Sequence, residues 1–273
     1  MSGITGAGSV RARDLRVAVG DVRVVEGCAA NAWPATMVQQ TDGWQVRYSP
    51  GVANRRANSV LPLFDHSAQN LADRIGDVET FYGQRQLPSR FMISPASQPE
   101  NLDDELERQG YHIDAPTLVQ WCATADVTGP DGDSAEVELL DGPTEDWMSV
   151  YMEDVQDQGE IALKSDLIMR IGAAHILAKI NGPGGAVAVG LCVYEKGWAG
   201  IFCMHTLQSH RRRGLGRQVL VELRDWARKK GAERMYLQVE SDNPSARQFY
   251  QTSGFVTQYG YHYRTKETEH AIE

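Results

Sequence analysis

The segment Arg211-Arg212-Arg213-Gly214-Leu215-Gly216 places three arginines directly before two closely spaced glycines. An apolar run at 198–207 precedes it, and apolar residues at helical spacing follow it as far as Lys230. This order predicts a strand, a glycine turn and a helix N-terminus. Such a turn directs unpaired backbone N–H groups and the positive end of a helix dipole at one point, and glycine lets an anion approach the backbone closely. We therefore expect a phosphate-bearing ligand at this turn.

The chain as a whole is acidic. Its 273 residues include 36 Asp and Glu against 27 Lys and Arg, which gives a net charge of −9. An acidic chain disfavours binding to nucleic acids and to anionic membranes, so the basic cluster of the turn is a local feature. There is also no run of about eighteen apolar residues that would cross a bilayer. We therefore expect neither nucleic acid nor membrane as a partner.

The chain contains four cysteines, and none belongs to a CxxC pair. Cys122, Cys192 and Cys203 lie in apolar, strand-like runs, which predicts reduced and mostly buried thiols. Segment 1–10 is rich in Gly and Ser and lacks the apolar centre of a signal peptide. These features favour a cytoplasmic protein. No set of His, Cys and carboxylate residues has metal-ligand spacing, so no metal is expected.

A polar, turn-forming cluster at 128–134 is the clearest linker in the chain. It predicts an N-terminal domain at 14–127 and a C-terminal domain at 135–266, each of ordinary domain size. The segments before Asp14 and after Lys266 are expected to be loose tails.

Hydrophobic periodicity predicts alternating strands and helices in both parts. In the C-terminal part, besides the strand and helix around the glycine turn, we expect strands at 136–140, 175–180, 186–194, 235–239 and 257–263 and helices at 144–154, 161–171 and 244–252, with Thr144 as an N-cap. In the N-terminal part we expect strands at 44–48, 91–94 and 117–125 and helices at 68–86 and 102–109. Leu106-x-x-x-Gly110-Tyr111 and Tyr250-x-x-x-Gly254-Phe255 both end a short helix with glycine and an aromatic, which indicates a weak internal repeat.

A second motif decides between a ligand site and an ordinary basic loop at the glycine turn. Segment 243–255 reads Asn-Pro-Ser-Ala-Arg-Gln-Phe-Tyr-Gln-Thr-Ser-Gly-Phe, an NxxAxxxYxxxGF pattern. With RxxGxG at 211–216, and a helix and a strand between the two, it resembles the GNAT superfamily of N-acetyltransferases. The resemblance covers the C-terminal half well, and the N-terminal half resembles a degenerate GNAT domain. The resemblance implies an α/β (α+β) fold of two GNAT-like domains, each a twisted mixed β-sheet flanked by helices.

The resemblance further implies acetyl-CoA as the acyl donor. Its pyrophosphate would lie on the backbone amides of the turn, and its pantetheine arm along the end of the preceding strand, where a β-bulge in relatives opens a slot for the thioester. A backbone N–H in that slot would polarise the acetyl carbonyl. The implied donor-binding residues are His205, Thr206, Leu207, Arg211, Arg212, Arg213, Gly214, Leu215, Gly216, Arg217, Asn243 and Tyr250.

Two residues are our candidates for proton transfer. Tyr250 stands where the family carries its general acid, and a phenol near the sulfur can protonate the departing thiolate; the alternative is that it only packs beside Phe249. Glu240, at the end of the preceding strand, is our candidate general base, with a solvated strand end as the alternative. His205 titrates in the useful range but is better explained by packing, and Glu160 by simple exposure.

Two further features admit a chemical role that we disfavour. Cys203 lies two residues from His205 on one strand face, which would allow an acyl-cysteine route, whereas the resemblance implies direct transfer in a ternary complex. Arg55 and Arg56 would hold an acceptor carboxylate or reach the active site, but an exposed turn or an interdomain salt bridge is the simpler interpretation. The N-terminal half has no RxxGxG turn, and Leu106 replaces the tyrosine, which argues against a second site.

The sequence thus predicts an N-acetyltransferase whose acceptor is a primary amine, on a small molecule or on a protein. A lysine or N-terminal protein acetyltransferase and a non-catalytic acyl-CoA sensor are the alternatives, and the intact Tyr250 argues against the sensor. A nucleic-acid-binding module would show steeply salt-dependent affinity and conflicts with the net charge. A homodimer is compatible with the family resemblance.

Overall fold

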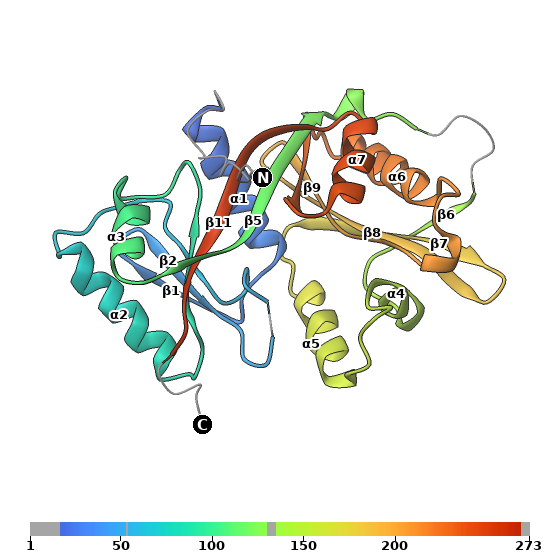
Figure 1. Ribbon diagram of the computed structural model, residues 1–273. Coiled ribbons are helices and arrows are strands. Elements are labelled where there is room, and N and C mark those ends of the chain that lie inside the picture. The colour runs from blue at the N-terminus through green and yellow to red at the C-terminus, as the bar shows by residue number, and fades with distance from the viewer. Residues whose placement is uncertain (1–16, 53, 130–134, 269–273) are drawn as a thin grey trace, which may run out of the picture.

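The computed structural model describes residues 17–52, 54–129 and 135–268, and there the strands form one mixed sheet (Figure 1). The strand order is β1-β2-β3-β4-β11-β5-β10-β9-β8-β7-β6. The strands are β1 Met37–Thr41, β2 Trp44–Tyr48, β3 Val60–Leu61, β4 Ser89–Ile93, β5 His112–Ala123, β6 Val137–Leu140, β7 Ala174–Gly182, β8 Gly185–Glu195, β9 Trp198–Thr206, β10 Arg234–Glu240 and β11 Val256–Lys266. The helices are α1 Val19–Ala32, α2 Leu71–Gly83, α3 Leu102–Arg108, α4 Glu145–Tyr151, α5 Gln158–Met169, α6 Leu215–Lys229 and α7 Pro244–Thr252.

Every helix and strand expected from periodicity is present, with shifted ends. Thr144 caps α4 by accepting a hydrogen bond from the Trp147 amide, as expected. The sequence interpretation missed α1, β1 and β3. Helix α1 was not predicted because its buried face mixes alanines and valines with the charged Glu26 and so lacks a strong apolar period, and because its N-cap, Ala18, offers no side-chain hydrogen bond. No helix in the described segments combines the length and hydrophobicity that a bilayer crossing requires.

The two parts of the chain interleave within the sheet. Strand β5, from before the 128–134 linker, lies between β10 and β11, which both follow it. Its residues 117–123 pair antiparallel with β10, while β11 also pairs with β4. The sheet therefore runs without a break across the linker, of which 130–134 lie outside the described residues. The domain limits expected from the sequence, 14–127 and 135–266, therefore remain a prediction.

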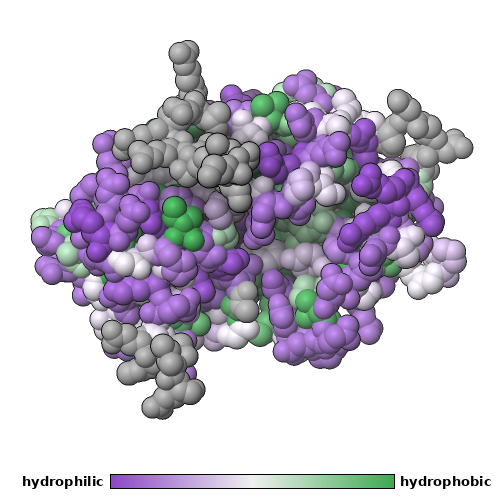
Figure 2. Space-filling model, in the orientation of Figure 1, coloured by the Kyte–Doolittle hydropathy of each residue, from purple (hydrophilic) through white to green (hydrophobic). Residues whose placement is uncertain are grey.

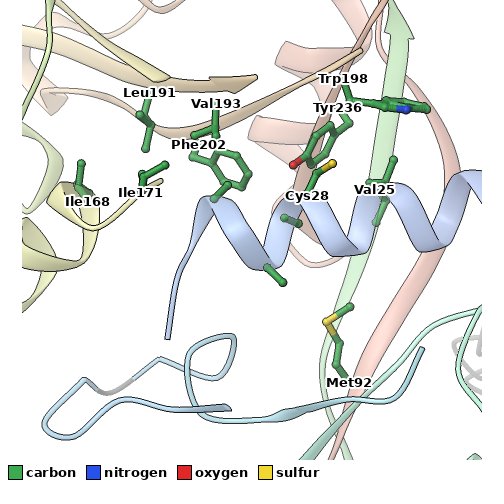
Figure 3. Close-up of a cluster of buried hydrophobic side chains, with 14 of the residues drawn as sticks. Val25, Cys28, Met92, Ile168, Ile171, Leu191, Val193, Trp198, Phe202 and Tyr236 are labelled. Carbon is green, nitrogen blue, oxygen red and sulfur yellow. The ribbon is translucent and has the colours of Figure 1, made fainter. Parts of the chain in front are cut away.

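The helices cover two faces of the C-terminal strands (Figure 1). Helices α6 and α7 pack on one face, where Val219, Leu220 and Leu223 are fully buried. Helices α1, α4 and α5 pack on the other face, around Trp147, Ile168 and Phe202. Figure 3 shows that α1 places Val25 and Cys28 beside Phe202, Trp198 and Tyr236, and that Met92 lies on its other side. Helix α1 thus fills the space between the two halves.

Gly254 follows the end of α7 and packs closely against the backbone at Asp126, which leaves no room for a side chain. Its φ is +104°, and an added Cβ would lie 2.5 Å from the Asp126 carbonyl oxygen. We expect Gly254→Ala to lower the free energy of unfolding by about 2 kcal/mol or more, because both the backbone conformation and the neighbouring backbone oppose it. Urea denaturation measures this.

Gly27→Ala is the matched control. Gly27 lies inside α1, and no atom lies within 4 Å of an added Cβ. Alanine should therefore stabilise the helix by about 0.5–1 kcal/mol. Equal stability of the two variants would contradict the described packing of Gly254.

Candidate active site

Strands β9 and β10 separate soon after they begin. They pair in parallel only at Trp198, Ala199 and Gly200 of β9. Beyond that point β10 continues along β5, and β9 continues along β8. The C-terminal half of β9 therefore leaves backbone groups on the side that faces β10 free for a ligand.

A β-bulge in β9 accompanies this separation. Val189 pairs with His205, but Leu191 pairs with Phe202, so Cys203 and Met204 together oppose Gly190. Cys203 has φ +52°, and an added Cβ on Gly190 would lie 2.5 Å from the Met204 sulfur. The bulge expected from the family resemblance is thus confirmed, and Gly190 makes space for it.

The glycine turn has the geometry of an anion site. Gly214 is the N-cap of α6 with φ +78°, and the first hydrogen bonds of the helix run from the amides of Arg217 and Gln218 to the Gly214 carbonyl. Within the described residues, the amides of 212–216 have no hydrogen-bond acceptor. Five N–H groups at a helix N-terminus are therefore available to an anionic ligand.

The turn contacts both β9 and α7. The Arg211 Nε donates to the Thr206 carbonyl at 3.1 Å, and the Arg217 guanidinium donates to the Thr252 carbonyl at 2.8 Å. An added Cβ on Gly216 would lie 3.5 Å from the Thr206 hydroxyl and 3.7 Å from the Phe249 ring. The structure thus brings together the turn, the end of β9 and the helix of the second motif.

Asn243 caps the helix that carries Tyr250. Its Oδ1 accepts a hydrogen bond from the Ala246 amide at 3.0 Å, and Pro244 occupies the first helical position. This bond fixes the side chain and leaves the Nδ2 amide group to donate elsewhere. Asn243 can therefore both start α7 and bind a ligand.

Tyr250 packs and also faces the bulge. Its ring lies 5.0 Å from Phe249 and 5.9 Å from Phe255 between centroids. Burial, and to a smaller extent the nearby Cys203, raises the pKa of Tyr250 well above its ordinary value. Its hydroxyl has no hydrogen-bond partner among the described residues. The phenol therefore keeps its proton and has it free to donate.

His205 and Cys203 line the other side of the slot. The His205 Nε2 lies 2.9 Å from Glu153, which also accepts a hydrogen bond from the Gln208 amide at 3.2 Å. The hydrogen bond with His205 holds the pKa of Glu153 below its ordinary range. Burial raises the pKa of Cys203 to about 12. A thiol that stays protonated is a poor nucleophile, which supports our rejection of the acyl-cysteine route.

A cleft of about 290 Å³ opens beside His205, between α4, α5 and β9. Figure 2 shows a hollow on this face of the molecule, between the side of α6 and α7 and the side of α4 and α5. The cleft is lined by Tyr151, Met152, Glu153, Asp154, Val155, Glu160, Lys164 and His205. Glu160 therefore lines a cavity and is not simply exposed on the surface. Glu153 and Lys164 also line the cleft, but they were not predicted from the sequence, because no pattern in the sequence links them to β9.

Arg55 and Arg56, the adjacent arginines of the N-terminal half, have different surroundings. Arg55 pairs with Asp114 at 2.6 Å and lies 3.9 Å from Glu240, so the expected salt bridge between the halves is confirmed. Glu240 itself is 58% exposed. Arg56 turns inward, where it lies over the Phe202 ring at 5.9 Å and donates to the Tyr261 hydroxyl at 3.3 Å. Arg56 thus reaches the region of β9 behind the bulge.

Glu26 on α1 is a buried carboxyl group that the sequence interpretation missed with its helix. It accepts hydrogen bonds from the Tyr259 hydroxyl at 2.7 Å and from the Gln238 amide at 3.0 Å. Burial outweighs these bonds and the attraction of Arg56, and it raises the pKa of Glu26 to about 7. Glu26 therefore changes its charge near neutral pH.

The chain is similar to proteins that carry the names of acetyltransferases. The family model described as "Probable histone acetyltransferase Rv0428c C-terminal" matches residues 19–264. The chain is 29% identical to the "Uncharacterized N-acetyltransferase YobR" of Bacillus subtilis over 250 residues, which is 90% of this chain and 99% of that protein. It is also 29% identical to the "Probable histone acetyltransferase Rv0428c" of Mycobacterium tuberculosis over 234 residues, which is 83% of this chain and 68% of that protein.

A solved structure shares the tandem arrangement. The "Tandem GNAT protein from the clavulanic acid biosynthesis pathway" aligns with a TM-score of 0.64 and 11% identity, and the alignment covers 92% of this chain and 97% of that chain. The fold and the site therefore define an acyltransferase of the GNAT superfamily with a tandem arrangement. Within this superfamily, the chain belongs to the family of the Rv0428c C-terminal region, because the family model matches nearly the whole length of the chain.

The raised pKa of Glu26 predicts a pH-dependent stability. Its ordinary value is 4.5 and its value in the fold is about 7, so the folded state binds the proton more tightly. The resulting stabilisation is complete below pH 4.5 and is lost as the pH rises through 7, a change of about 3 kcal/mol. Urea denaturation at pH 5 and pH 8 measures this. Between pH 5 and pH 8, wild type should lose about this much free energy of unfolding relative to Glu26→Gln, which cannot titrate at this position.

The Gln238 side chain can accommodate this change, because its Oε1 is buried without a partner in the described segments and can accept a bond after the amide flips. Glu233→Gln, which removes an exposed carboxylate, controls for the loss of one charge. Parallel profiles for wild type and Glu26→Gln would show that Glu26 does not titrate in this range.

Proposed function

We propose that this acyltransferase moves an acetyl group from acetyl-CoA to a primary amine by direct attack within a ternary complex. The observation that carries the proposal is the separation of β9 from β10 at the bulge, with the glycine turn beyond the end of β9 and Tyr250 near Cys203. GNAT acetyltransferases generally use acetyl-CoA. All four cysteines are free thiols, which supports a reducing compartment such as the cytoplasm.

The residues of the turn fit a coenzyme A phosphate. The unpaired amides from Arg212 to Gly216 supply donors, and no atom lies within 4 Å of a Cβ on Gly214, which leaves space for the anion. Arg211 or Arg217 would pair with the ribose phosphate. The end of β9, His205 to Leu207, would pair with the pantetheine arm, to which the Asn243 amide group would donate.

Acetyl-CoA supplies an activated thioester when bound. The amine nitrogen bonds to the acetyl carbon, the carbon–sulfur bond breaks, and the sulfur leaves with the electron pair. Tyr250 gives its proton to the sulfur, which suits a phenol that burial keeps protonated. The acceptor must lose a proton from its ammonium form, and Glu240 at the end of β10 remains our candidate to receive it, directly or through water.

A protein acceptor is the second candidate, and the name of one relative favours it. Glu153, Asp154 and Glu160 line the cleft beside His205 and would attract a lysine ammonium. The Mycobacterium tuberculosis relative carries the name of a histone acetyltransferase. A non-catalytic acyl-CoA sensor would not need Tyr250.

Replacing Tyr250 with phenylalanine tests the proposed reaction. The ring packing remains while the proton donor is lost, so kcat should fall about 100-fold or more, with little change in the KM for acetyl-CoA. Release of coenzyme A is followed with a thiol reagent over a panel of amines. Tyr194→Phe, a partly exposed tyrosine at the far end of β8, is the control and should turn over like wild type. Unchanged turnover in Tyr250→Phe would limit Tyr250 to packing.

A further inference from the structure

Two lysines of equal burial differ in their charged neighbours: one is paired with carboxylates and the other is not. Lys164 on α5 and Lys179 on β7 are each 9% exposed. Lys179 lies 2.8 Å from Asp146 and 3.4 Å from Glu138. Lys164 has no carboxylate within 4 Å and no hydrogen-bond acceptor within the described residues. Its ammonium lies 5.5 Å from the centroid of the Trp33 ring. The Lys164 stem is buried, but its ammonium is not among the buried polar atoms that lack a partner, so it is open to the cleft and available to an anionic ligand.

Lys164 lies where an acceptor would approach the thioester. It lines the cleft together with His205 and Tyr151, and it is near enough to Cys203 to lower the pKa of that thiol against the larger effect of burial. It stands on the face covered by α4 and α5, whereas the glycine turn belongs to α6 on the opposite face (Figure 1). Lys164 is therefore not placed to bind the donor phosphates.

Arg56 brings a second cation from the N-terminal half close to Cys203, although it does not line the cleft itself. It also lowers the pKa of the Cys203 thiol, and it packs over Phe202, the residue before the bulge. Among the described residues it has no carboxylate within 4 Å, and its hydrogen bond goes to Tyr261. The loop that carries it packs Val52 and Ala57 against the same cluster as Cys203. Two cations with no carboxylate within 4 Å among the described residues thus lie near the bulge, and Arg56 is attracted at longer range by Glu26.

We propose that Lys164 and Arg56 bind a carboxylate of the acceptor, which is then a small amino acid rather than a lysine within a protein. The proposal rests on the acetyltransferase function proposed above. Glu153 and Glu160 line the same cleft and would hold the ammonium form of the acceptor amine, while the cations hold its acid group. A cleft of about 290 Å³ suits a molecule of this size.

The test compares acids with their amides. The twenty L-amino acids, their carboxamides and a lysine-containing peptide with blocked ends are each offered with acetyl-CoA, and release of coenzyme A is measured. We expect at least one free amino acid to exceed its amide in kcat/KM by about tenfold to a hundredfold, as a charged hydrogen-bonded group contributes. Lys164→Met should raise the KM for that acid by a similar factor and leave the amide unchanged. Arg56→Gln should act in the same direction.

Lys179→Met is the matched control. It removes a lysine of the same burial and should leave the KM for the acid unchanged. It should also lower the melting temperature, because it leaves Asp146 and Glu138 without their cation. Lys164→Met should leave the melting temperature of the free protein nearly unchanged, because the ammonium is open to the cleft and has no carboxylate within 4 Å. If Lys164 served only the fold, its replacement would lower the melting temperature and leave the KM for the acid unchanged.

Three results would overturn the proposal. The first is equal turnover of acids and amides, and the second is turnover of the blocked peptide alone. The third is no turnover of any free amino acid, although acetyl-CoA stabilises the protein against heat. The last two leave the acetyltransferase function intact. A protein that acetyl-CoA does not stabilise would instead contradict the proposed function, and this proposal would fall with it.

Discussion

The site depends on one backbone constraint, the early separation of β9 from β10. Two residues of β9, Cys203 and Met204, oppose the single residue Gly190, so the strand bends away after three pairs with β10. Gly190 is required there because a side chain would overlap Met204, Val219 and Leu223. A continuous ladder would leave no backbone groups for a ligand. The bulge therefore connects the packing of α6 to the opening that we propose as the reaction site.

The interleaved halves hold that opening in place. Strand β5 supports β10 along 117–123, and α1 packs below the point of separation with Phe202 and Tyr236 as neighbours. Arg55 joins Asp114 to the end of β10 at Glu240, while Arg56 points to the bulge. The N-terminal half has no RxxGxG turn of its own, but its Arg55 and Arg56 reach the end of β10 and the region of the bulge, where we propose that the acceptor binds.

The residues that we propose for the donor side form motifs visible in the sequence, whereas those that we propose for the acceptor side do not. RxxGxG and NxxAxxxYxxxGF are local patterns, since a turn, a cap and a helix are each made by neighbouring residues. The contacts of Glu153 with His205, of Arg56 with Phe202 and of Lys164 with Trp33 join elements far apart in the chain, and no spacing rule encodes them. Helix α1 was missed because its buried face lacks a strong apolar period, and Glu26 was missed with it.

Thermal unfolding with and without acetyl-CoA tests the central claim, that the turn and the separated strands form a donor site. At a hundredfold the dissociation constant, the ligand should stabilise wild type by about 2.7 kcal/mol. Gly214→Glu places a carboxylate where the phosphate should lie, and it should lose the shift. Gly184→Glu, at the open turn between β7 and β8, should keep it. No shift in wild type, or an equal shift in Gly214→Glu, would contradict the account.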